Sequence, residues 1–483
     1  MPRLSQLREE RIKKLAKVRE AGIDPYPAIV SRTRLLGSLV AKFEELERSQ
    51  KQISIVGRIR SIRIHGKAAF LDVEDTSGKI QLFMTQSDTQ RFQFFLDVLD
   101  EGDIIGAKGQ AYLSKRKEKS LKVISLVLLV KSLRPLPKEW FGLKDTEERF
   151  RRRYLDLIFN REVRDRFLKE AKILRELRSY LDNQHFHEVV TPILQPLAGG
   201  ALAKPFKTHF NALDIGVVLR IAPELYLKRL LVGGFEKIYE MGPVFRNEGL
   251  DREHNPEFLM LELYWAYQDW EGLMEFTEKW LWTVAQKSEF ILPPPPWQRA
   301  EFEVLFEEKI GLNYQKSSEE ALLAIAKEKG VVVNRRLSKA KIADELFKKL
   351  IRPELQAPIF ITKLPIEISP FAKRLGNDKV RTARFILYIN GLELVNGFSE
   401  LNDPQDQEER FLSQQEMKKT GDEEVTEYDR DFIEALEYGM PPAAGLGLGV
   451  TRFLMLLTGA PNVREAMLFP LMKLKNSNDG QTE

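Results

Sequence analysis

Side chains with a chemically useful spacing lie in one short stretch near the middle of the chain. Arg246 and Glu248 are separated by a single residue, and His254 follows them in a segment that predicts a loop. Beyond the loop, β-strand alternation places Glu262 and Tyr264 on one face. A guanidinium binds the paired oxygens of carboxylates and phosphates, and a buried carboxylate requires a cation or several hydrogen-bond donors. These residue types are therefore suited to binding charged ligands.

The strand that carries these groups also presents apolar side chains. The same alternation adds Phe258 and Met260 to the face of Glu262 and Tyr264. A half-solvated antiparallel strand with its polar face in water produces the same pattern. This strand alone therefore leaves both interpretations open.

A second alternating segment lies closer to the C-terminus. Alternation there places Asn396, Phe398 and Glu400 on one face of a strand and Glu393 on the other. The first three residues are therefore expected to share an environment that Glu393 does not enter.

Two glycine-rich segments complete the pattern. Glycines at every second position over residues 445–449 allow a ligand or a neighbouring strand to approach the backbone, although tight strand-to-helix packing explains them equally well. Arg452 follows where a helix is predicted to begin, and it would add to an anion site there. Upstream, Pro192 marks a strand edge or bend, and Gly199 and Gly200 predict a flexible turn.

Together these four segments resemble the signature motifs of the class II aminoacyl-tRNA synthetases, and within that class the lysyl-tRNA synthetases. The segment around Pro192 resembles motif 1, residues 246–262 resemble motif 2, and residues 445–452 resemble motif 3. Residues 220–240 and 396–403 match the lysine enzymes better than the aspartate and asparagine relatives. The resemblance runs from the N-terminal helix nearly to the C-terminus. It implies a lysine–tRNA ligase that forms lysyl-adenylate from lysine and ATP and transfers lysine to the 3′ end of its tRNA.

The resemblance and the periodicity together predict an α+β fold with two main domains. Five strand-like runs with a helix after the third follow the order of an OB-fold barrel, expected over residues 51–131 after a helical extension over 1–50. A linker over 132–145 leads to a class II catalytic domain over 146–483, with a mostly antiparallel sheet flanked by helices. Amphipathic pieces over about 297–356 predict an inserted helical subdomain.

The resemblance implies roles at the ATP end of the site. Arg246 is expected to bridge the substrate carboxylate and the α-phosphate. Arg246 and Arg452 are the two residues expected to be catalytic. Glu248 is expected to accept from the adenine amino group, while Phe258 and Arg452 enclose the adenine ring. His254 is expected at the distal phosphates, although a lone histidine in a loop is more often a surface residue.

Lysine selection requires negative charge at the far end of the pocket. The resemblance implies that Glu400 and Tyr264 meet the ε-ammonium. A site built around buried carboxylates rejects substrates that lack the cation. The remaining residues expected to bind lysine are Gly200, Glu224 and Glu262 at the α-ammonium, Asn396 at the carboxylate end, and Phe398.

Four positions depart from the family pattern. Ile386 stands where the family has a second acidic magnesium ligand, which leaves Glu393 as the expected Mg²⁺ ligand. Thr451 replaces the acidic residue that usually precedes the motif 3 arginine, and His185 replaces a glycine in motif 1. Ser125 stands where an anticodon-side glutamate is expected.

Charge is unevenly distributed along the chain, which has a net charge of +4. Residues 1–145 hold 28 Lys and Arg against 18 Asp and Glu, whereas the remaining residues hold 47 against 53. A basic N-terminal domain indicates a polyanionic partner, although a solubilising surface explains the charge alone. The resemblance implies that Arg63, Phe70 and Gln81 hold the anticodon of a lysine tRNA. A core position is the alternative for Phe70.

Composition limits the remaining possibilities. The 483 residues contain no cysteine, which excludes disulfides and cysteine-ligated zinc and is compatible with a reducing cytosol. No secretory signal or apolar run of transmembrane length is present, so a cytoplasmic location without membrane contact is expected. The resemblance implies a homodimer. Two alternatives remain open, a lysine-activating paralogue that modifies a protein such as elongation factor P and a non-catalytic RNA-binding protein on the same scaffold.

Overall fold

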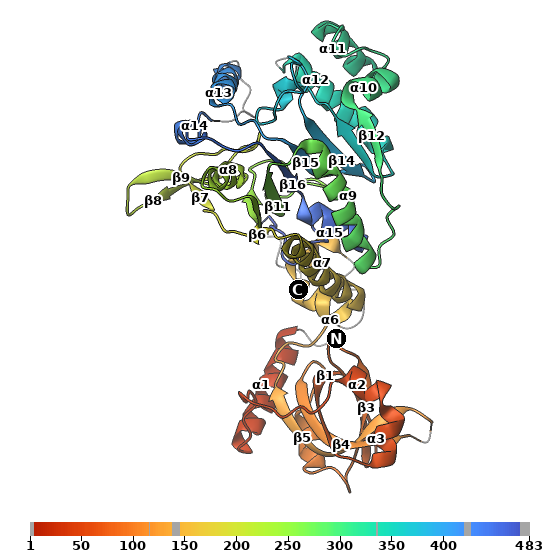
Figure 1. Ribbon diagram of the computed structural model, residues 1–483. Coiled ribbons are helices and arrows are strands. Elements are labelled where there is room, and N and C mark those ends of the chain that lie inside the picture. Colours follow the sequence, from red (N-terminus) through yellow and green to blue (C-terminus); the bar gives the residue numbers. More distant parts are fainter. Residues whose placement is uncertain (1–3, 115, 138–144, 335–336, 420–426, 474–483) are drawn as a thin grey trace. The chain divides into compact units, whose positions relative to one another are not determined.

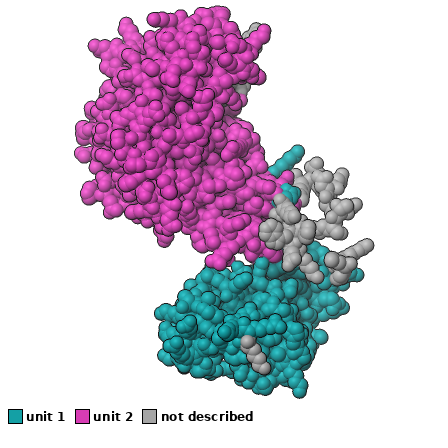
Figure 2. Space-filling view, turned by 90° about the vertical axis from the view of Figure 1, so that its right-hand side faces the viewer, with its two compact units in different colours: residues 1–145, 473–483 teal, residues 146–472 magenta. Residues whose placement is uncertain are grey.

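The chain forms two compact units that are described separately. The structure is a computed structural model that describes residues 4–114, 116–137, 145–334, 337–419 and 427–473. The first unit comprises residues 1–145 and 473–483, and the second comprises residues 146–472 (Figure 2). None of the helices in the described ranges combines the length and the apolar character that a membrane crossing needs.

A closed five-stranded barrel dominates the first unit (Figure 1). Its elements are α1 (Leu4–Glu20), α2 (Leu36–Ala41), α3 (Phe43–Ser49), β1 (Ile53–His65), β2 (Ala68–Glu74), β3 (Lys79–Thr85), α4 (Phe92–Val98), β4 (Ile104–Leu113) and β5 (Lys119–Val130). The strand order is β1-β2-β3-β5-β4, and alternate residues such as Ile53, Ile55, Leu71 and Val73 are buried inside. The predicted barrel with a helix after its third strand is confirmed.

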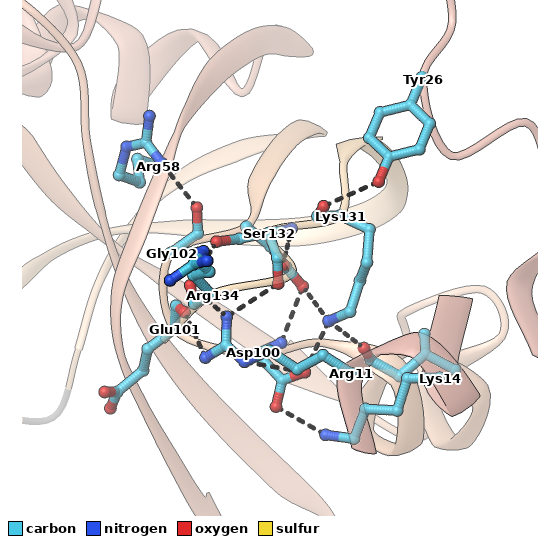
Figure 3. A network of polar contacts seen from close by, with 12 residues as sticks. Arg11, Lys14, Tyr26, Arg58, Asp100, Glu101, Gly102, Lys131, Ser132 and Arg134 are labelled. Atoms are coloured by element: carbon cyan, nitrogen blue, oxygen red, sulfur yellow. Dashed lines mark hydrogen bonds and ion pairs between the residues drawn. The ribbon is translucent and has the colours of Figure 1, made fainter. Parts of the chain in front are cut away.

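A buried ion-pair network attaches α1 to this barrel (Figure 3). The Nζ atom of fully buried Lys131 lies 2.6 Å from Asp100 and 2.7 Å from Asp103. Lys14 of α1 reaches the other oxygen of Asp100 at 2.7 Å, and Arg11 donates to the carbonyl of Ser132 at 2.9 Å. Burial raises the pKa of Asp100, but Lys131 and Lys14 outweigh it and hold this pKa below its usual value. The basic helix α1 is therefore packed on the barrel through specific carboxylates.

The second unit is built on an eight-stranded, mostly antiparallel sheet with the order β12-β13-β14-β15-β16-β11-β10-β6. A separate three-stranded sheet has the order β7-β9-β8. The strands are β6 (His187–Glu188), β7 (Leu194–Gln195), β8 (Lys207–Phe210), β9 (Ile215–Leu219), β10 (Lys237–Phe245), β11 (Glu257–Ala266), β12 (Gln298–Glu301), β13 (Ile359–Thr362), β14 (Arg384–Ile389), β15 (Leu392–Ser399) and β16 (Ala443–Leu448). The predicted α+β class is confirmed.

Helices cover one face of the large sheet. The helices of this unit are α5 (Thr146–Arg151), α6 (Arg153–Phe159), α7 (Arg161–Asn183), α8 (Glu224–Val232), α9 (Trp270–Lys287), α10 (Phe302–Ile310), α11 (Glu319–Glu328), α12 (Lys339–Leu346), α13 (Pro404–Lys419), α14 (Arg430–Glu437) and α15 (Val450–Thr458). Leu261, Leu263 and Phe385 point to this covered face and share a core with α7, α9 and α15. Because side chains alternate along a strand, Met260, Glu262 and Tyr264 must emerge on the opposite face.

Two local features of this unit bear on the sequence predictions. Residues 297–356 contain α10, α11 and α12 as expected, but they begin with β12, which pairs in parallel with β13 at the edge of the main sheet. His185, between α7 and β6, has a φ of 64°. This left-handed conformation favours glycine, which accounts for the residue that the family pattern has there.

Candidate active site

A cavity of about 320 Å³ lies on the opposite face of the sheet, over β11, β14, β15 and β16. The predicted residues that line it are Gly200, Glu224, Arg246, Glu262, Tyr264, Glu393, Asn396 and Phe398. The predicted residues outside its lining are Glu248, His254, Phe258, Glu400 and Arg452. One concave space thus gathers residues from segments far apart in the chain.

Arg246 follows β10 and enters this cavity. Its guanidinium lies 5.2 Å from the centre of the Phe258 ring, and its Nε donates to the carbonyl of Ile221 at 3.4 Å. Burial lowers the pKa of Arg246, while the carboxylates of Glu248 and Glu262 favour its charged form. Glu248 itself is exposed in the loop. The pair Arg246 and Phe258 offers a cation and an aromatic face side by side, as anion and ring recognition require.

Arg452 occupies the first turn of α15 and connects three segments. Its Nη1 donates to the carbonyl of Glu393 at 3.1 Å, and its Nε donates to the carbonyl of Glu253 at 3.3 Å. Its Nη2 lies 2.9 Å from Nε2 of His254, whose Nδ1 lies 2.7 Å from Asp251. His254, Arg452 and the helix start therefore form one electropositive corner.

The prediction that Glu393 faces away from Asn396 is wrong. Leu387 pairs with Val395 but Tyr388 pairs with Glu393, so the register shifts by one residue in β15. Such a β-bulge reverses the alternation beyond it. Glu393 and Asn396 consequently both line the cavity.

Three buried carboxylates and a phenol lie in and beside the cavity. The hydroxyl of Tyr264 donates to Glu262 at 3.1 Å. Burial and the neighbouring Glu224 carboxylate raise the pKa of Glu262 to about 8, and burial raises the pKa of Glu400 to about 8. Burial also raises the pKa of Glu224. The cluster is therefore poised to release protons when cations bind.

A residue that the sequence prediction missed stands among these carboxylates. Lys228 of α8 is fully buried, and its Nζ lies 2.6 Å from an oxygen of Glu224 and 2.6 Å from an oxygen of Glu400. The spacing of four residues between Glu224 and Lys228 on a helix is the sequence pattern that predicts their contact. The contact with Glu400 depends on tertiary structure alone.

Two glycines make the close packing of this cluster possible. A Cβ at Gly445 would lie 2.5 Å from ring carbons of Tyr264 and would also collide with Oε1 of Glu400. Gly200 has a φ of 84°, and a Cβ there would lie 2.8 Å from Cβ of Glu224. The glycine pattern of 445–449 therefore reflects close approach of side chains to the strand backbone.

The donor set around Glu393 suits at most one carboxylate-bound magnesium ion. Ile386 lies across from Asn396, is buried, and offers no oxygen ligand. Among residues within the described ranges, no group of three His, Cys, Asp or Glu side chains is arranged to hold a metal. Lys348, 2.6 Å from Asp344, also lines the cavity.

The helical insertion brings this lysine and two further charged side chains to the cavity. Lys341 and Asp344 of α12 line it together with Lys348, which follows that helix. Burial lowers the pKa of Lys348, but Asp344 and Glu393 outweigh it, so its pKa lies above its usual value. An ammonium therefore acts on Glu393, and Ile386, where an acidic ligand was expected, lines the same cavity.

A half-buried aromatic stack crosses the surface of the barrel in the first unit. Phe70 and Phe83 stack with ring centres 5.2 Å apart, and Phe83 and Tyr112 stack at 5.5 Å. Arg63 lies beside Phe70 in the β1–β2 register and pairs with both oxygens of Asp72, at 2.8 and 3.2 Å. Phe70 lies outside the buried core of the barrel, and the sequence prediction missed its partners Phe83 and Tyr112.

Gln81 is buried at the edge of this surface. Its amide donates to Glu118 at 3.1 Å and accepts from Ser120 at 3.2 Å. Ser125 pairs with Lys108 elsewhere on β5. The carboxylate beside Gln81 is therefore that of Glu118, seven positions before Ser125.

Comparisons with known proteins match both units. The family described as tRNA synthetases class II (D, K and N) matches residues 145–473, and the family described as OB-fold nucleic acid binding domain matches residues 53–129. The chain is 44% identical to a lysine–tRNA ligase of Syntrophomonas wolfei, with 98% of each chain covered. It is 46% identical to that of Thermoanaerobacter pseudethanolicus (98% of this chain, 97% of the other) and 45% identical to that of Carboxydothermus hydrogenoformans (97% and 98%).

Proposed function

Because the chain belongs to the lysine–tRNA ligases among the class II aminoacyl-tRNA synthetases, we propose that the cavity over β11, β14, β15 and β16 is its active site. Such a ligase joins the lysine carboxylate to the α-phosphorus of ATP, releases pyrophosphate and transfers lysine to the 3′ end of tRNA. Both reactants carry negative charge, so the site must neutralise charge and hold them in line.

One observation carries this proposal: a single cavity is lined by the cation Arg246 and by the acidic cluster of Glu224 and Glu262. Lysine carries a carboxylate and two ammonium groups, which match this distribution. Arg246 binds the carboxylate and the α-phosphate through its forked donors, and it stabilises the charge that develops between them.

The side chains around Glu224 and Glu262 select lysine. Glu400 and Tyr264 receive the ε-ammonium, and Glu224, Glu262 and the carbonyl of Gly200 receive the α-ammonium. Asn396 binds at the carboxylate end, and Phe398 packs along the aliphatic chain. Burial supports these roles because an unpaired carboxylate penalises any substrate without the cation.

ATP binds at the corner formed by the motif 2 loop and α15. Phe258 and Arg452 enclose the adenine, Glu248 accepts from its amino group, and His254 contacts the distal phosphates. The contact of Arg452 with His254 supports a common ATP site for the two residues. Magnesium, when bound, neutralises phosphate charge. Glu393 would hold it together with the phosphates and water, since the ion usually takes one or two carboxylates.

The barrel reads the tRNA anticodon. Phe70, with Phe83 and Tyr112, offers stacking surfaces to unpaired bases, while Arg63 and Gln81 supply hydrogen bonds. The barrel also distinguishes this chain from lysine-activating paralogues that lack one. We place the reaction in the cytoplasm, where tRNA is charged.

The active form is a homodimer. Apolar side chains are exposed around motif 1, where Val190 is 91% and Leu194 is 53% accessible. Clustered exposed apolar groups mark an interface, and homodimers bury the same patch on both subunits. Sedimentation equilibrium should give twice the chain mass, and a monomer at micromolar concentration would refute the dimer.

The test of the function is amino-acid-dependent ATP–pyrophosphate exchange with a panel that includes lysine, ornithine, arginine, aspartate and asparagine. Lysine should support exchange, ornithine should do so weakly, and the acidic and neutral amino acids should not. Charging of purified lysine tRNA should follow. Exchange that proceeds with aspartate or asparagine in preference to lysine would refute the proposal.

A further inference from the structure

Lys228 is a cation buried within the acidic cluster that no assigned role uses. Its side chain is fully buried, and its ammonium lies 2.6 Å from Glu224 and 2.6 Å from Glu400. It also lies over the rings of Phe371 and Phe398, at 4.9 and 5.4 Å from their centres. A buried ammonium is retained only where carboxylates and aromatic faces compensate for its lost hydration.

The groups that face Lys228 come from four elements. Glu224 is on α8, Glu400 follows β15, Glu262 and Tyr264 are on β11, and Arg384 on β14 acts on Glu224 from beyond. Burial lowers the pKa of Lys228, but Glu224 and Glu400 outweigh it, so the side chain is an ammonium at neutral pH.

The contact of Lys228 leaves one oxygen of Glu400 available. Lys228 forms an ion pair with Oε2 at 2.6 Å, and neither oxygen of Glu400 has a further hydrogen-bond partner among the described residues. Oε1 lies against Gly445 and beside the Tyr264 ring, both of which line the cavity. A carboxylate fixed through one oxygen presents the other in a defined direction, which preorganises a cation site.

The formal charges of Lys228 and the three carboxylates can be compared with the charges of a lysine substrate. Glu224, Glu262 and Glu400 carry three negative charges when ionised, and Lys228, which contacts two of them, cancels one. Arg384 also lines the cavity, but it donates to Asn396 and Ser369 instead of to these carboxylates. The two negative charges that remain equal the two ammonium groups of lysine, while Arg246 matches its carboxylate. A cluster without Lys228 would keep a surplus negative charge, and a proton would bind there instead.

We propose that Lys228 is a positioning residue of the lysine pocket, which orients Glu400 and Glu224 and sets the pocket charge to accept two ammonium groups. The inference rests on the proposed assignment of this cavity to lysine. Lys228 contacts the two carboxylates and the ring of Phe398, and it acts on the substrate only through these groups. The side chain of Lys228 has the same aliphatic stem and ammonium as the lysine substrate. The carboxylate cluster therefore binds this chemical group within the protein as well as in the substrate.

Lys228→Met tests the charge while keeping the volume of the stem. Loss of a close cation raises a carboxylate pKa by about 1–3 units, so the KM for lysine at pH 7 should rise about 10-fold or more. The increase should shrink as the pH is raised toward 9, because the extra proton leaves the carboxylates. The KM for ATP should stay within about twofold of the wild-type value, since no ATP contact changes.

Lys228→Ala with an added amine separates charge from packing. n-Butylamine, which reproduces the lysine stem and its ammonium, should lower the KM for lysine in Lys228→Ala, whereas n-butanol should not. Lys228→Met should not respond to the amine because its side chain occupies the space. If a variant no longer folds at assay temperature, its melting temperature is compared with each additive. Recovery by the amine alone supports the proposal, and equal recovery by both overturns it.

Glu400→Gln distinguishes failure of this inference from failure of the site assignment. A normal lysine KM in Lys228→Met together with a raised one in Glu400→Gln would make Lys228 a space-filling residue and overturn the inference. Normal values in both variants would remove lysine from this cavity altogether.

Discussion

Substitution of Gly445 by alanine should damage lysine binding selectively. Gly445 lies on β16, opposite Tyr264 on β11 and Phe398 on β15. A Cβ at this position would lie 2.5 Å from carbons of the Tyr264 ring and would also collide with Glu400. Real Cβ atoms do not approach other atoms so closely, so the phenol, the carboxylate or the strand must move.

The free protein can relieve this collision more easily than the lysine complex. Tyr264 borders the cavity and can shift into it, but bound lysine would block that shift. Overpacking of this kind costs about 1–3 kcal/mol. If most of this cost is expressed on binding, the KM for lysine should rise about 5-fold to 160-fold, at 1.36 kcal/mol for each factor of ten.

The assay is lysine-dependent ATP–pyrophosphate exchange with each substrate varied in turn. The KM for ATP should change little, because the predicted ATP contacts at Arg452 and Phe258 lie away from Gly445. Gly216→Ala on β9 is the matched control, since nothing lies within 4 Å of a Cβ added there. A folded Gly445→Ala variant with the wild-type KM for lysine would refute the placement of lysine against β16. An equal rise in both KM values would indicate general distortion of the sheet.

Four further predictions follow from the same geometry. Arg246→Ala should abolish exchange with the melting temperature preserved, a loss of about 2.7–4 kcal/mol of transition-state stabilisation, and near-normal exchange in the folded variant would remove Arg246 from the reaction. Phe70→Ala should weaken tRNA charging but spare adenylate formation, since its partners lie on the barrel surface; parallel loss of both would indicate an unfolded barrel. Ile386→Glu should leave the magnesium dependence of exchange unchanged, because the ammonium of Lys348 already acts on Glu393, whereas the double variant with Lys348→Met should lower the half-maximal magnesium concentration. A magnesium titration with melting curves decides, and a shift in the single variant would show that Lys348 does not take the place of the missing ligand. Because the pKa of Glu262 is raised to about 8, this carboxylate is largely protonated at pH 7 in the free enzyme. The KM for lysine should therefore fall as the pH rises from 7 to 8.5. A KM that stays flat or rises over that range would contradict the assignment of Glu262 to lysine binding.

Part of the site follows directly from local periodicity. Alternation along β11 is a property of any extended strand, so Met260, Glu262 and Tyr264 had to share one face whatever surrounded them. The order of five strands and a helix in the barrel could be predicted from the sequence for the same reason. The family pattern added the identity of the ligand, which periodicity alone leaves open.

The position of Glu393 shows the limit of prediction from alternation. Glu393 was expected on the face opposite Asn396, but Asn396 pairs with Ile386 and Glu393 pairs with Tyr388 after a register shift. The register shift at Leu387 and Tyr388 turns Glu393 into the cavity, and it lies outside Val395–Ser399, the part of β15 that pairs with β16. Alternation within β15 does not encode this shift.

Contacts between distant segments were decided only by the tertiary structure. The helical spacing of Glu224 and Lys228 is visible in the sequence, but Glu400 reaches the same ammonium only after α8 has packed on the sheet in one core with Tyr264. Lys348 likewise meets the cavity through the packing of the insertion. Local sequence determines which face of an element is polar. Strand register determines which charged side chains come into contact, and burial selects among these contacts because each unpaired buried charge is costly.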